Sequence, residues 1–160
     1  MNWLDTVAVL TIVVVVGLEG WRKFGKSLYD TIGIVLSVHI AHLAQAGLAS
    51  MVKFSAAPDT NQAVSFGVAF GVLVALTVVG STYLYRVTLL ALPDAFEGFG
   101  GALLGLVSGI VIGHAVVWAV YTANGGDVAA NPYIHTVAVQ QLVKWDAYHQ
   151  AMFELKHLGD

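Results

Sequence analysis

Three long runs of uncharged, mostly apolar residues constrain this chain more than any other feature. They cover residues 31–52, 63–85 and 98–123, and none of them contains Asp, Glu, Lys or Arg. A helix needs about 20 such residues to cross the hydrocarbon core of a bilayer. Each run therefore predicts one transmembrane helix, and the helix over 63–85 can continue to residue 92, where Pro93 would stop it.

A shorter apolar run at 6–18 is flanked by Trp3 and Trp21, a residue type that gathers at membrane interfaces. We predict a first helix over 2–21, with a re-entrant or interfacial segment as the alternative. Basic residues follow this run instead of preceding it, and no small-residue cleavage site comes after it. A retained helix is therefore expected, and not a cleaved signal peptide.

The composition agrees with a chain that resides in lipid. Hydrophobic residues make up 58% of the sequence and charged residues 11%, whereas soluble domains carry about 25% charged residues. We predict an all-α integral membrane fold with about four transmembrane helices, and we exclude a soluble enzyme. The formal net charge of -3 offers no basic surface for nucleic acid, and the lack of cysteine excludes disulfides and thiolate chemistry.

The last part of the chain has a different pattern. An Asn-Gly-Gly-Asp sequence at 124–127 breaks the fourth helix, and the Asn-Pro pair at 131–132 is typical of a helix start. We predict a transmembrane domain over 1–130 and an amphipathic tail over 131–160. The tail is expected to be helical from about 132 to 158 and to lie on the membrane or the bundle. A solvated helix in contact with nothing is the alternative.

Basic residues set the expected orientation. Arg22, Lys23 and Lys26 lie between the first two helices, and Arg86 lies between the third and fourth. Because Lys and Arg are enriched in cytoplasmic connections, we expect both of these connections in the cytoplasm and both termini outside.

Glycines recur at intervals of four in two of the predicted helices. Such small-xxx-small stripes let helices approach closely in lipid, where association depends on packing. We expect the stripe to face a neighbouring helix of the same chain, with an oligomer seam or a pore lining as the alternatives. These helix-packing candidates are Gly67, Gly71, Gly101, Gly105, Gly109 and Gly113.

Three histidines fall inside predicted membrane helices. His39 and His42 are one turn apart on the second helix, and His114 is on the fourth. Histidines from two helices could bind a haem iron axially; alternatively, neutral histidines could hydrogen-bond between helices. No carboxylate lies at their depth, so we expect no metal site. No nucleophile–base pair or phosphate-binding loop stands out, and we expect a non-catalytic protein.

Three stretches of the chain resemble the colicin V production protein (CvpA) family. They are the opening Asn2-Trp3-Leu4-Asp5, the Gly-Trp-Arg-Lys-Phe-Gly-Lys sequence at 20–26 continuing to Gly33, and the glycine-rich run at 101–109. The family's Leu-Asp-Arg ahead of these glycines is replaced here by Phe-Glu-Gly at 96–98. The resemblance implies a multi-pass protein of the bacterial plasma (inner) membrane that supports bacteriocin production or export and envelope homeostasis. It supplies no catalytic residues.

Two other functions stay open from the sequence. One is an oligomeric channel with a glycine-lined helix. The other is a haem-binding or accessory subunit of a larger membrane complex that uses the three histidines. In each case the expected partners are membrane lipid and either further copies of the chain or other membrane proteins.

Overall fold

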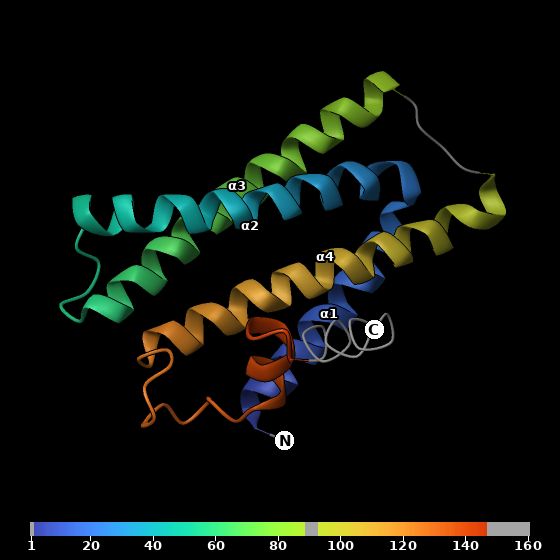
Figure 1. Cartoon of the computed structure of the whole chain (residues 1–160). Coiled ribbons are helices and arrows are strands. Elements are labelled where there is room, and N and C mark those ends of the chain that lie inside the picture. Colours follow the sequence, from blue (N-terminus) through green and yellow to red (C-terminus); the bar gives the residue numbers. More distant parts are fainter. Residues whose placement is uncertain (1, 89–92, 147–160) are drawn as a thin grey trace, which may run out of the picture.

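Four long helices make up most of the computed structural model, which describes residues 2–88 and 93–146 (Figure 1). They are α1 (Trp3–Arg22), α2 (Phe24–Met51), α3 (Pro58–Thr88) and α4 (Asp94–Ala123). All four are long and apolar enough to cross a membrane, and the described residues contain no strand. The prediction of an all-helical chain with four potential membrane spans is confirmed.

Three of the helices begin earlier than their uncharged runs. Helix α2 starts at Phe24 instead of residue 31, α3 at Pro58 instead of 63, and α4 at Asp94 instead of 98. Charged side chains are disfavoured in lipid, but they are tolerated in a helix when they turn inward and pair. Asp30 of α2 does so, and a boundary placed at the first charge therefore shortens the helix.

The helices form two pairs that cross (Figure 1). Helix α2 packs with α3, α1 packs along α4, and α2 and α4 meet between the pairs. Consecutive helices α1 and α2 touch little, although only Lys23 separates them. Lys23 has φ 69° and ψ 162°, a conformation that favours glycine, and this single residue makes the sharp corner between the two helices.

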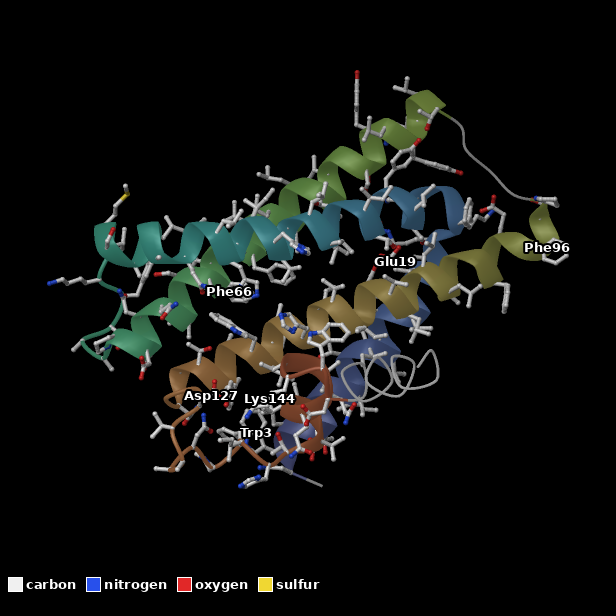
Figure 2. All side chains as sticks on the ribbon, viewed as in Figure 1. Trp3, Glu19, Phe66, Phe96, Asp127 and Lys144 are labelled. Carbon is white, nitrogen blue, oxygen red and sulfur yellow. The ribbon has the colours of Figure 1, made fainter. Side chains whose placement is uncertain are left out.

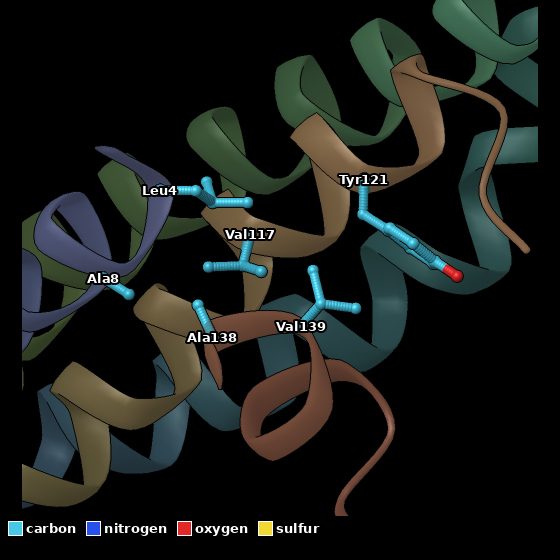
Figure 3. Close-up of a cluster of buried hydrophobic side chains, with 6 residues drawn as sticks. All are labelled: Leu4, Ala8, Val117, Tyr121, Ala138 and Val139. Atoms are coloured by element: carbon cyan, nitrogen blue, oxygen red, sulfur yellow. The ribbon is translucent and has the colours of Figure 1, made fainter. Parts of the chain in front are cut away.

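Two clusters of buried apolar side chains hold the bundle together. One joins α1 and α4 to the segment after α4, and consists of Leu4, Ala8, Val117, Tyr121, Ala138 and Val139 (Figure 3). The other joins α2, α3 and α4, and consists of Val38, Ala41, Phe66 and Ala115. Outside these clusters most large apolar side chains point outward, as expected for helices whose surroundings are lipid.

The predicted amphipathic helix from 132 to 158 is not confirmed. Turns occupy 132–135, and the helical segment that follows is short and contains the π-helix η1 (Val139–Val143). Asn131 Oδ1 accepts the N–H of Tyr133 at 2.9 Å and closes a turn there, and the N–H of Ala138 bonds to Asp5 of α1, which holds the segment on the bundle. Residues 147–158 of the predicted helix lie outside the described residues.

The described part of the tail packs on the bundle. The carboxylate of Asp5 accepts the backbone N–H of Ala138 at 2.8 Å, and Trp3 Nε1–H donates to the hydroxyl of Tyr133 at 3.2 Å. Asn131 Nδ2 donates to the carbonyl of Tyr121 at 2.9 Å. The segment after α4 therefore returns to the start of α1.

Candidate functional site

The glycine stripe of α4 lies against α1. A Cβ atom at Gly105 would lie 2.8 Å from Glu19 Cβ and 2.9 Å from Val16 Cα, and one at Gly109 would lie 3.0 Å from Ile12 Cα. A Cβ at Gly101 would likewise meet the backbone carbonyl of Glu19. Three of the four glycines therefore let the backbones of α1 and α4 meet, and a pore lined by this face has no room within the chain.

The other glycines of the two stripes have different surroundings. A Cβ at Gly113 would touch Leu142 of the tail at 3.5 Å and Ile12 at 3.6 Å, which is ordinary contact. Gly67 and Gly71 lie on an outward face of α3, where no other part of the described chain comes within 4 Å of such a Cβ. Within one chain, these two glycines do not serve close packing.

Charged side chains are buried at the corner between α1 and α2. Arg22 Nη2 lies 2.9 Å from Asp30 Oδ2, and Arg22 Nη1 lies 3.5 Å from Glu19 Oε1. The side chain of Asp30 is fully buried, and its other oxygen accepts the hydroxyl of Ser81 from α3. Figure 2 shows Glu19 between the ribbons at this corner.

The three basic residues near this corner do not form a loop. Arg22 is the last residue of α1, Lys23 is the whole connection, and Lys26 lies in the first turn of α2. The three residues predicted to form a basic loop are therefore a helix–helix corner, in which Arg22 pairs inward. Across the corner, Glu97 of α4 is buried and its carboxylate accepts the N–H of Phe24, the first residue of α2, at 3.2 Å.

Hydroxyl groups continue the polar contacts along α2. Thr31 Oγ1 lies 2.9 Å from Ser108 Oγ of α4, and Ser37 Oγ lies 3.3 Å from Thr77 Oγ1 of α3. Hydrogen bonds of this kind hold helices together in lipid.

Two of the three intramembrane histidines meet. His42 Nε2 and His114 Nε2 are 3.4 Å apart, which joins α2 to α4. His39 does not join them, because its Nδ1 bonds to the carbonyl of Val35 in its own helix. The ring of His42 is held by Phe66, with centroids 4.6 Å apart, and by Trp118 at 4.7 Å.

A cavity of about 530 Å³ borders this pair. Its wall is mostly apolar, with imidazole rings and one indole as the polar groups, and it is lined by Val35, Val38, His39, His42, Leu43, Val111, His114 and Trp145. Clefts of this size and character are the usual binding sites for small molecules. Within the described residues, this cavity places open space beside imidazole nitrogens that can bind a ligand.

The geometry of the pair bears on the haem hypothesis. Two axial ligands lie on opposite faces of a porphyrin, which separates them with the macrocycle between. Here the two imidazole nitrogens are already in contact at 3.4 Å, and aromatic rings hold one of them in place. The arrangement has no slot for a porphyrin between the rings.

Sequence reasoning named these histidines but missed the buried corner. The spacing of three between Glu19 and Arg22 is typical of a pair on one helix, whereas the spacing of eight between Arg22 and Asp30 gives no direct sign that they pair. Ser81 in an apolar run was the available signal, because a polar residue in a membrane helix needs a hydrogen-bond partner.

Comparison of the chain with protein-family models, curated proteins and solved structures finds no match.

Proposed function

We propose that this chain is a non-catalytic, multi-pass protein of the bacterial inner membrane, of the colicin V production type, which supports bacteriocin export or envelope homeostasis. The observation that carries the proposal is the contact between two separate stretches that resemble the family. Gly20 of the 20–33 stretch lies against Ala102 of the 101–109 stretch, and a Cβ at Gly20 would be 3.4 Å from Ala102 Cβ. Thr31 Oγ1 also bonds to Leu104 O at 3.3 Å.

The opening stretch, residues 2–5, belongs to the same unit. Leu4 is fully buried in the cluster with Val117, and Asp5 holds the tail through Ala138. Short apolar motifs match easily by chance in membrane helices. Motifs that are far apart in sequence and form one packed unit support a shared architecture.

The position that departs from the family also has a structural role. Glu97 stands in the Phe-Glu-Gly sequence at 96–98, and its carboxylate bonds to the start of α2. A negative charge near the first N–H groups of a helix is favourable. This contact ties α4 to the α1–α2 corner without the arginine of the family pattern.

A genetic experiment tests the function. The gene is deleted in its bacterial host, and resistance to detergent and to cell-wall antibiotics is measured together with secreted bacteriocin activity. We expect the deletion to lower at least one of these, and wild type and Gly17→Ala to restore it. Gly17 is outward-facing, and no described atom lies within 4 Å of a Cβ built there. Gly105→Leu should fail to restore it.

A deletion strain that equals its parent in all three measurements would contradict the proposed function. Restoration by Gly105→Leu would show that the function does not depend on the close contact between α1 and α4.

Orientation is tested separately. We propose that the α1–α2 corner faces the cytoplasm, because three basic residues gather there. Reporter fusions after Ser27 and after Asp59 should report cytoplasm and exterior, respectively. A cytoplasmic signal from the Asp59 fusion would overturn this topology.

A further inference from the structure

A hydrogen bond alone does not explain the arrangement of the histidine pair between α2 and α4. His42 and His114 face each other through Nε2 atoms at 3.4 Å, beyond the usual range of about 2.7–3.2 Å for a hydrogen bond from N–H. Each ring is also held by other groups. Phe66 and Trp118 pack on His42, and the tail holds His114.

The contact with the tail fixes the proton on His114. Its Nδ1 lies against the carbonyl oxygen of Leu142, which can only accept, so Nδ1 carries hydrogen and donates it. The neutral ring then presents a lone pair at Nε2, toward His42. A ring N–H bonded to a backbone carbonyl, with the other nitrogen free, is the arrangement that orients histidine as a metal ligand.

We propose that His42 and His114 bind a divalent transition-metal ion, with Zn²⁺ as the reference ion. Nitrogen ligands lie about 2.05 Å from zinc, and two of them at a tetrahedral angle are therefore about 3.3 Å apart. The observed separation is 3.4 Å. The two nitrogens thus stand at ligand spacing. The ring centroids are 5.7 Å apart, so the two Nε2 atoms face each other, and each ring must turn to aim its lone pair at a shared ion.

The cavity beside the pair supplies the remaining positions of the ion. Its volume of about 530 Å³ holds several water molecules or an exogenous ligand next to Nε2 of both rings. Within the described residues, no group of three or more His, Asp or Glu side chains could hold a metal. The site therefore has two protein ligands and an open side, and water or hydroxide completes the coordination.

His39 is not assigned as a ligand. It lines the same cavity, but its Nδ1 bond to Val35 keeps the ring on its own helix. This makes His39 a matched control, since it has the same chemistry, the same helix and the same cavity. His135, an exposed histidine of the tail, is a second control outside the cavity.

The full chain is purified in detergent with a tag that lacks histidine, treated with chelator and dialysed. Binding of Zn²⁺ is measured by equilibrium dialysis with elemental analysis, and Co²⁺ is added as a spectroscopic stand-in. We expect one ion per chain and a visible absorption band with Co²⁺. His42→Gln and His114→Gln should each weaken binding at least tenfold. His39→Gln and His135→Gln should stay within threefold of wild type.

Failure of wild type to bind one ion per chain would overturn the proposal, as would equal losses in His39→Gln and the two ligand variants. Circular dichroism and gel filtration show whether each variant folds. If a variant does not fold, the proposal is tested on the wild-type protein by protection from chemical modification. Zn²⁺ must protect His42 and His114, and not His135, from carbethoxylation mapped by mass spectrometry. The proposal does not depend on the envelope function, and each can fail alone.

Discussion

Replacing Gly105 with alanine tests the tightest contact between α1 and α4. The added Cβ would lie 2.8 Å from Glu19 Cβ and 2.9 Å from Val16 Cα. Both distances are shorter than real Cβ contacts, and one of them is to backbone, which cannot turn aside. Helix α1 must therefore move away from α4.

The expected magnitude combines two opposing effects. Overpacking in a close-packed interior costs about 1–3 kcal/mol. Alanine in place of glycine in a helix gains about 1 kcal/mol from propensity. Gly105→Ala should therefore lower the free energy of unfolding by roughly 0–2 kcal/mol. Gly105→Leu adds more bulk at the same point and should be worse.

Gly17→Ala isolates the packing effect, because Gly17 lies in α1 with no described atom within 4 Å of its added Cβ. It keeps the propensity gain alone, so the two variants should differ by about 1–3 kcal/mol. Unfolding by denaturant in detergent micelles, followed by circular dichroism, measures both. Equal stability of Gly105→Ala and Gly17→Ala would refute the close approach of α1 and α4.

Three further perturbations follow from the corner and the tail. Lys23→Gly should stabilise the chain by about 1 kcal/mol, because φ 69° with ψ 162° favours glycine; Lys23→Ala should give no gain in the same unfolding assay. Asp30→Asn should cost about 3 kcal/mol, since it removes the closer of the two buried carboxylates that pair with Arg22, and equal stability of the variant would contradict the ion pair. The hydrogen bond from the hydroxyl of Tyr121, and then the ammonium group of Lys144, lower the pKa of Asp127. Because the pKa is lower in the folded state, the stabilisation by this carboxylate is complete at neutral pH and is lost as pH falls below about 4. Asp127→Asn should therefore remove that part of the acid dependence of unfolding.

The sequence predicted the number of membrane helices well, because their signal is additive along the chain. Twenty apolar residues in a row leave few alternatives to a membrane helix. Helix ends were less accurate, since a charge was taken as the edge of the membrane. Asp30 shows the error, because a carboxylate paired with Arg22 can remain inside the bundle.

The tail was predicted less well for a different reason. Spacing of apolar residues indicated a helix from 132, but the side chain of Asn131 and the docking of Ala138 on Asp5 gave a turn instead. The bond between Asp5 and Ala138 joins residues that are far apart in the chain, and periodicity within one segment carries no information about it. The same limit means that the sequence could not tell which of the two histidines of α2 lies opposite His114; in the structure it is His42.

Helix α2 unites the features that give this bundle its interior. Its inward side carries Ser27, Asp30, Thr31 and Ser37, while Ile32, Leu36, Ile40 and Leu43 point outward. The inward side also carries Ile34, Val38 and Ala41, so polar and apolar groups share the interior, because in lipid the polar groups need partners while apolar groups are also stable on the outside. The ion pair near one end of α2 and the histidine pair toward the other lie on the same inward side. Changes along this side of α2 should therefore affect both the packing of the bundle and any ligand site, whereas changes at Ile32, Leu36 and Ile40, which do not line the cavity, should affect neither.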